Sequence, residues 1–352
     1  MAHHKDWKKL LKADPTGWLL EPEDPGVRYL ALRDLTDADG NELSAAREKA
    51  YRNGPIGTIL ENMDPDGYWV TPGLGYGPKC RSTVWSLISL AQLGASIDDD
   101  ERVAAACAYF LENGVSKGGQ ISPIGRPTGT AHCLQGNVLA TLADMGCRDS
   151  RLDTAWEWMA RAVTKEDLPV KINPDGLAPG EGVSGRFRYL HRYDGPVFAC
   201  QTNKHLSCGW GGVCVMMAFS RLPVEHRTEL IGRAIQAGVD FFLDNEPAKA
   251  GFPGHRAGTP DPRWWQFKFP DFWPSDVLKL AEAFTTLGYG NDPRLADTLQ
   301  LVRGKQDDNG RWALDYVDKT RKMWVKYGTE GKPNKWITLR AMRLLKRAGE
   351  AG

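Results

Sequence analysis

The sequence carries almost no net charge and has no long hydrophobic run. Its 45 Lys and Arg nearly balance its 44 Asp and Glu over 352 residues, which gives a formal charge of +1. This balance excludes the basic field that attracts nucleic acid or an anionic membrane. No uncharged run reaches the roughly 18 residues of a membrane span, and the first residues lack the apolar core of a signal peptide. We therefore expect a soluble, cytoplasmic protein that neither binds nucleic acid nor inserts into a membrane.

Cysteine usage and strand patterns exclude two further classes. The seven cysteines are odd in number and several lie inside apolar helical runs, which favours reduced thiols over a disulfide framework. The sequence shows no series of alternating apolar and polar runs that would form strands. Tryptophan is abundant, with 13 residues; most can be structural, and such a surplus also lines apolar or sugar-binding cavities. We predict an all-α protein.

The stretch of residues 200–219 shows the pattern most clearly. It begins as a polar loop with Cys200, His205 and Cys208, and then continues to Phe219 without a charge. A helix that is apolar on every side is buried all round. Free backbone N–H groups and the helix dipole at its start favour a thiolate or another anion. The stretch therefore predicts a buried helix that opens on a reactive, enclosed site.

The same unit recurs along the chain: an apolar helix, a tight turn with Gly or Pro, an amphipathic helix and a long loop. A short amphipathic helix within residues 5–20 comes first. The further helices are predicted at residues 27–35, 42–63 with a break near Pro55, 81–94, 99–113, 132–146, 150–163, 208–222, 224–245, 275–288, 292–306 and 334–348. The residues 98–101, three Asp and a Glu, are predicted to cap the helix that follows them.

About six inner apolar helices with outer amphipathic partners describe one all-α domain over residues 1–352, an (α/α)6 toroid of helical hairpins. The N-terminal helix would complete the sixth pair by meeting the last helix across the ring. Each inner helix follows a long loop, so we expect all inner N-termini, and the chemistry, at one mouth. The loops expected to build a lid there are residues 68–80, 117–131, 165–207, 246–274 and 313–333.

A short repeat carries a family resemblance. Residues 306–312 read Gln-Asp-Asp-Asn-Gly-Arg-Trp, a full Q-x-x-x-G-x-W, and residues 63–69 are a degenerate copy that begins with Met63. The repeat resembles the QW motif of the squalene cyclase and protein prenyltransferase superfamily, the terpenoid cyclase-like proteins. Residues 83–94, 133–137 and 331–340 are similar to short bacterial proteins labelled as prenyltransferase or squalene-oxidase repeat proteins.

The resemblance implies an (α/α)6 toroid and a substrate that is small, largely apolar or cyclic, and isoprenoid-like. The QW motif itself is expected to be structural, with its Gln capping a helix and its Trp stacking on a neighbouring turn. The acidic D-x-D-D motif of the cyclases and the D-D-x-x-D pattern for diphosphate are absent from the sequence. Polyene cyclisation and diphosphate ionisation therefore have no obvious centre in this chain.

Two chemistries fit the polar residues at the predicted mouth. The first is the binding of a zinc ion by Cys133, Cys200, His205 and Cys208. Protein prenyltransferases resemble this in holding zinc inside the same type of barrel. Their ligand motif is not reproduced in this sequence. The second chemistry is acid–base or covalent catalysis by these side chains without a metal. The residues predicted to carry out the reaction are Asp276, His205, His132, Tyr76 and Cys80. Each also has a structural interpretation: small buried thiols, hydrogen-bonded core histidines, and an Asp that only satisfies its helix terminus.

Aromatic and basic residues are predicted to bind the substrate: Trp85, Trp210, Tyr189, His191 and Lys335. The dense aromatic run of residues 264–273 suits a cavity wall or closure of the core. We expect an enzyme, a lyase, hydrolase, isomerase or transferase, acting on a small molecule in the central cavity. One alternative is a polysaccharide lyase or glycoside hydrolase of the (α/α)6 type, and another is a non-catalytic binding protein or partner subunit. The sequence does not decide the oligomeric state.

Overall fold

The computed structural model describes residues 7–123, 130–166, 198, 200, 203, 206–252 and 260–350. Within these ranges the chain is helical, and extended pairing is limited to isolated antiparallel bridges between Val115 and Ile121 and between Ala313 and Pro333. The all-α prediction is confirmed. Among the described helices none combines the length and apolarity needed to cross a membrane.

The α-helices begin and end close to the predicted bounds. They are α1 (Thr16–Leu19), α2 (Pro25–Leu35), α3 (Gly40–Asn53), α4 (Pro55–Glu61), α5 (Thr83–Gln92), α6 (Glu101–Gly114), α7 (His132–Asp144), α8 (Ser150–Thr164), α9 (Gly209–Arg221), α10 (Glu229–Leu243), α11 (Val277–Phe284), α12 (Ala296–Gly304) and α13 (Lys335–Glu350). The chain segment that was expected to be one amphipathic helix within residues 5–20 forms only a 3₁₀ turn, Trp7–Leu10, and the short α1. A π-helical turn, Thr285–Tyr289, extends α11.

Aspartate side chains start several of the outer helices. Asp39, Asp100 and Asp149 accept hydrogen bonds from backbone N–H groups in the first turns of α3, α6 and α8. Such caps satisfy donors that a helix leaves free at its N-terminus. The cap at Asp100 confirms the predicted role of the acidic residues 98–101. The inner helices α5, α7 and α9 have no side-chain cap, and backbone and tertiary contacts hold their starts.

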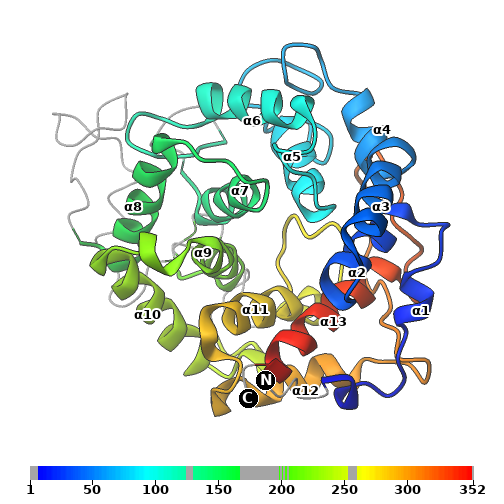
Figure 1. Cartoon of the computed structure of the whole chain (residues 1–352). Coiled ribbons are helices and arrows are strands. Elements are labelled where there is room, and N and C mark those ends of the chain that lie inside the picture. Colours follow the sequence, from blue (N-terminus) through cyan, green and yellow to red (C-terminus); the bar gives the residue numbers. More distant parts are fainter. Residues whose placement is uncertain are drawn as a thin grey trace, which may run out of the picture.

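The helices are arranged around a centre (Figure 1). The helices α2, α5, α7, α9, α11 and α13 lie inside, and α3, α6, α8, α10 and α12 lie outside them. Neighbouring inner helices pack on one another: α5 contacts α7, α7 contacts α9, α9 contacts α11, α11 contacts α13, and α13 contacts α2. The 3₁₀ turn Trp7–Leu10 packs against α13, so the first described residues meet the last helix.

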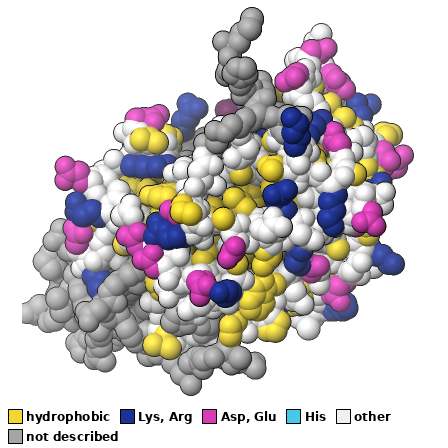
Figure 2. Space-filling model, turned by 90° about the horizontal axis from the view of Figure 1, so that it is seen from below, with side chains coloured by type: hydrophobic (Ala, Val, Ile, Leu, Met, Phe, Trp, Pro, Cys, Tyr) yellow, Lys and Arg dark blue, Asp and Glu magenta, His cyan; other side chains and the backbone are white. Residues whose placement is uncertain are grey.

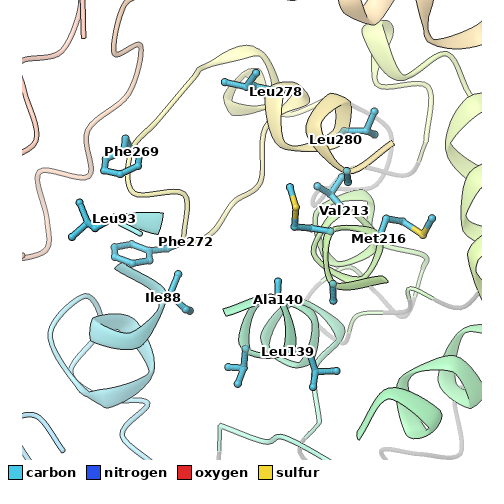
Figure 3. Close-up of a cluster of buried hydrophobic side chains, with 14 of the residues drawn as sticks. Ile88, Leu93, Leu139, Ala140, Val213, Met216, Phe269, Phe272, Leu278 and Leu280 are labelled. Carbon is cyan, nitrogen blue, oxygen red and sulfur yellow. The ribbon is translucent and has the colours of Figure 1, made fainter. Parts of the chain in front are cut away.

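The helix α9 is the buried helix predicted from residues 200–219. Every residue from Gly209 to Ser220 is buried. Its closest neighbour is α7, where a Cβ atom at Gly136 would lie only 2.4 Å from the backbone carbon of Cys214. Glycine at this position therefore allows the two backbones to approach. Figure 3 shows side chains of α7 and α9, among them Leu139 and Met216, in the hydrophobic core.

The tryptophans of both copies of the Q-x-x-x-G-x-W repeat make the same contacts. The indole N–H of Trp312 donates to the carbonyl of Val302 (2.7 Å), and its backbone N–H donates to the hydroxyl of Thr338 at the start of α13 (2.9 Å). In the first copy Trp69 donates in the same way to Ile59 and Thr83. Each tryptophan thus ties the end of one helix to the start of an inner helix.

The glutamine of the full copy holds the N-terminal segment. Its side-chain oxygen accepts the backbone N–H of Lys12 (2.9 Å) and its amide donates to the carbonyl of Leu10 (3.4 Å). Gln306 was expected to cap a helix, and instead it binds this segment. The first copy has Met63 at the same place and lacks this contact type. The expectation that the motif is structural agrees with these bonds.

The surface shows mixed charge. On the face seen from below Figure 1, Lys and Arg are interspersed with Asp and Glu, with hydrophobic side chains between them (Figure 2). This mixture accords with the formal charge of +1. No field of one sign is visible on this face among the residues that the structure describes.

Candidate active site in the central pocket

A pocket of about 560 Å³ lies among the six inner helices. On α2, α5, α7 and α9 the lining residues run from about the middle of each helix toward its C-terminal end, beginning with Leu30, Ile88, Asn137 and Met217 respectively. The pocket therefore lies toward the C-terminal ends of these inner helices. This differs from the expectation that the chemistry gathers where the inner helices begin.

Residues 267–274, here called the crossing segment, close the pocket at its base. The segment leads into α11 and runs through the middle of the ring (Figure 1). Two amide side chains hold it. Gln92 accepts the N–H of Asp271 (2.8 Å) and donates to its carbonyl (3.0 Å), and Asn137 donates to the carbonyl of Phe272 (2.7 Å). Phe269 and Phe272 bury their rings in the hydrophobic core (Figure 3), so the segment is fixed by both polar and apolar contacts.

The carboxylate of Asp271, in the crossing segment, is buried at the pocket. The residue is 1% exposed and lines the pocket. Among the described residues neither of its carboxylate oxygens has a hydrogen-bond partner. Burial raises the pKa of Asp271, and the nearby Asp276 adds to this effect, while the charge of Lys279 opposes it. A buried polar group without a hydrogen bond is costly and rare outside functional sites.

Two buried cations face this carboxylate. The Nζ atom of Lys279 lies 3.5 Å from Oδ2 of Asp271 and donates a hydrogen bond to Oδ1 of Asn137 (2.7 Å). Arg340 lies 3.9 Å from Asp271 and makes two hydrogen bonds to Glu282, of 3.1 and 2.6 Å. Burial alone would lower the pKa of Lys279, but the nearby Asp271, Cys214 and Asp276 together outweigh it and hold the pKa above its usual value. The base of the pocket therefore combines an acid–base group with fixed positive charge.

Asp276, the carboxylate predicted to be catalytic, lies next to this cluster. It is fully buried and caps α11 by accepting the N–H of Lys279 (2.9 Å), and Nζ of Lys268 lies 3.4 Å from its other oxygen. Burial would raise the pKa of Asp276, but Lys268 and Arg340 hold it below its usual value. Asp276 is not among the residues that line the pocket. Its contacts match the structural interpretation weighed beside the catalytic one.

The predicted thiols come together at the starts of α7 and α9. A hydrogen bond to the Cys200 thiol and burial raise the pKa of Cys208. Burial raises the pKa of Cys133 to about 12, with smaller contributions from Cys214 and Cys200. These thiols are therefore protonated, in contrast to the thiolate expected from the helix termini, because loss of water outweighs the helix dipole here.

The zinc prediction stays a prediction. Three of its ligands, Cys133, Cys200 and Cys208, are neighbours, and the fourth, His205, lies outside the described residues. Within the described residues no group of three or more His, Cys, Asp or Glu is placed to hold a metal ion. No step proposed below involves a metal.

The predicted catalytic residues His132, Tyr76 and Cys80 also lie at the starts of inner helices. Burial lowers the pKa of His132 to about 4, so its imidazole is neutral. Burial raises the pKa of Tyr76 and of Cys80. Cys80 lines a smaller pocket of about 90 Å³, together with Lys268 and Tyr327. None of the three lines the central pocket.

The residues predicted to bind substrate are spread more widely. The ring of Trp85 lies 5.4 Å from Tyr76, and that of Trp210 lies 5.3 Å from Trp273, so both are part of the aromatic packing near the helix starts. Lys335 forms an ion pair with Glu21 (2.8 Å) away from both pockets. The remaining two, Tyr189 and His191, lie outside the described residues.

Sequence reasoning missed the residues at the base of the pocket: Gln92, Asn137, Asp271, Lys279, Glu282 and Arg340. One signal was available. Lys279 and Glu282 are charged residues in a helix that is otherwise apolar, and a charge on an inner helix faces either a partner or a cavity. The helix α13 carries Arg340 on its buried face in the same way.

Comparison with known proteins adds no assignment. No family model matches the sequence, and no curated protein matches it.

Proposed function

We propose that this protein is an enzyme that converts a small molecule in the central pocket, with Asp271 as the acid–base group. The observation that carries the proposal is the buried carboxylate of Asp271, which faces a pocket of about 560 Å³ without a hydrogen-bond partner among the described residues. Its raised pKa brings the group closer to the range in which a carboxyl both takes up and releases a proton near neutral pH. Lys279 and Arg340 are placed to stabilise negative charge that develops next to it.

The fold assignment is part of this proposal. We take the arrangement of inner and outer helices as an (α/α)6 toroid, related to the terpenoid cyclase-like proteins by the Q-x-x-x-G-x-W repeat. The identical hydrogen bonds of Trp69 and Trp312 support a repeated unit. The pocket also has apolar lining, for example Ile88 and Leu339, which accords with a substrate that has an apolar or cyclic part.

The test compares wild type with Asp271→Asn. Each protein is incubated with a cellular small-molecule extract, and compounds that disappear or arise are followed by mass spectrometry. Asp66→Asn, in an exposed turn, is the matched control. We expect at least one compound to be converted by wild type and Asp66→Asn and about a hundredfold more slowly by Asp271→Asn, the effect of losing a general acid or base. Equal conversion by Asp271→Asn would contradict the role of this residue.

A second candidate function is hydrolysis or elimination of a sugar polymer. It is favoured by the rings of Phe269 and Trp336, which line the pocket, stack at 4.7 Å and are accompanied by carboxylates. Release of reducing sugar, or of unsaturated sugar, from a panel of polysaccharides tests it. The third hypothesis is a non-catalytic binding protein. It predicts that the pocket retains a compound that is recovered unchanged.

Zinc is a separate proposal for the starts of α7 and α9. It is supported by the proximity of the Cys133, Cys200 and Cys208 thiols. Metal analysis of the purified protein and of single Cys→Ser variants tests it: stoichiometric zinc that is lost in the variants supports it, and a metal content that does not change rejects these ligands.

A further inference from the structure

The wall of the central pocket formed by α2 and α13 has an excess of positive charge. It contains the cations Arg33, Arg343, Lys346 and Arg347 and the carboxylates Asp34 and Glu350, and Arg33 and Arg343 both contact Asp34. Arg33 makes two hydrogen bonds to Asp34, of 2.7 and 3.1 Å, and Arg343 forms an ion pair with the same carboxylate. One carboxylate thus balances two guanidinium groups.

The other two cations of this wall bind neutral oxygens. Lys346 donates to the backbone carbonyl of Asp34 (2.9 Å), and Arg347 donates to the hydroxyl of Thr286 (2.9 Å). Neither bond neutralises charge. The wall therefore attracts an anion of suitable size, since cations in a pocket with low-dielectric walls raise the local concentration of anions.

Arg343 keeps one donor for a ligand. Among the described residues its buried Nε atom has no hydrogen-bond partner, whereas its Nη2 atom forms the ion pair with Asp34. Burial, together with the guanidinium of Arg33, lowers the pKa of Arg343, against the opposing charge of Asp34. An anion beside Arg343 would accept its unpaired N–H group and would stabilise its positive charge. The Nε–H group of an arginine can donate a charge-assisted hydrogen bond to a carboxylate or phosphate group.

We propose that the substrate of this pocket is a small organic anion. A carboxylate or phosphate group binds at Arg343 and Arg347, an apolar or ring body lies against residues such as Leu30 and Trp336, and a hydroxyl or amino group donates to Asp271. This inference rests on the proposed function, because it makes Asp271 the partner of the reacting part of the substrate. The cationic wall and the unpaired carboxylate then have complementary partners on one molecule.

Calorimetric titration with three aromatic probes tests the inference. The anions are 4-hydroxybenzoate and phenyl phosphate, and 4-hydroxybenzyl alcohol is the neutral counterpart. We expect at least one anion to bind wild type at least tenfold more tightly than the alcohol. We expect Arg343→Gln and Arg347→Gln each to weaken that binding by about tenfold or more, the value of one charge-assisted hydrogen bond.

Two controls make the outcome decisive. Arg52→Gln, on the exposed face of α3, should bind as wild type does. Arg347→Gln removes a bond to a hydroxyl only, so the inference stays testable even if Arg343→Gln unfolds. Equal affinity for anion and alcohol, absence of binding of both anions, or unchanged affinity in the Arg347→Gln variant would overturn it. Asp271→Asn should keep most of the affinity for the anion. The proposed function is tested separately by turnover: it fails if Asp271→Asn still converts the substrate at the wild-type rate.

Discussion

Lys279 and Asp271 face each other at the base of the central pocket, with 3.5 Å between Nζ and Oδ2 and no hydrogen bond joining these atoms. Lys279 directs a hydrogen bond of 2.7 Å to Asn137 instead. The lysine thus neutralises part of the charge of Asp271 but leaves its oxygens available. A substrate donor can therefore bind there without breaking an internal hydrogen bond.

The first prediction concerns this pair. Lys279→Met removes the cation that opposes the raised pKa of Asp271, so the pKa should rise further, by about one unit or more. The infrared band of the protonated carboxyl, identified by its loss in Asp271→Asn, reports the titration. Lys279→Arg keeps a cation and should titrate close to wild type. A midpoint in Lys279→Met at or below that of wild type would show that the pair is not coupled.

Asp276 should prove structural. Asp276→Asn keeps a capping side chain but leaves Lys268 and Arg340 without this anion, and we expect a loss of about 3 kcal/mol in the free energy of unfolding at pH 7. Asp276→Ala also loses the cap and should cost about 1 kcal/mol more. Urea denaturation measures both. If the two variants were as stable as wild type, the buried contacts of Asp276 would carry no stabilising energy.

His132 should make the protein sensitive to mild acid. Its pKa is about 4 in the folded protein and about 6.5 when unfolded, so between these values the unfolded chain binds a proton that the folded chain does not. Stability therefore falls as pH decreases through this window, by about 2 kcal/mol between pH 7 and pH 5 from this residue. His132→Gln should remove that part of the loss in urea denaturation. His226→Gln, at an exposed position, should keep it; an unchanged slope in His132→Gln would contradict the buried, neutral imidazole.

Two half-buried cysteines should differ in reactivity. Burial raises the pKa of Cys133 to about 12, whereas a hydrogen bond from Cys107 lowers the pKa of Cys147. The thiolate fraction of Cys133 at pH 8 should be roughly a thousandfold below that of a free thiol. Alkylation of the native protein with iodoacetamide, followed by peptide mass spectrometry, should label Cys147 well before Cys133. The reverse order would indicate a thiolate at the start of α7.

The sequence pattern predicted helix positions well because burial repeats along the chain. The uncharged run that ends at Phe219 is the buried α9, and the break at Pro55 separates α3 from α4. These features depend on local composition and on proline geometry. For Asp276, at a helix start, the same local reasoning left catalysis and capping open.

The central pocket could not be predicted in this way, because it depends on contacts between distant residues. Gln92 and Asn137 bind the backbone of the crossing segment over separations of 179 and 135 residues. These bonds place Asp271 at the base of the pocket. Local patterns pointed to the thiols and imidazoles at the helix starts, where burial leaves His132 and Cys133 neutral.

The most direct test of the account is a comparison of binding and turnover in Asp271→Asn, with the compound that wild type converts. The account predicts a dissociation constant within about tenfold of wild type and a kcat reduced about a hundredfold or more, since a general acid or base acts in the chemical step. A kcat equal to that of wild type would contradict it and would move the chemistry away from the central pocket.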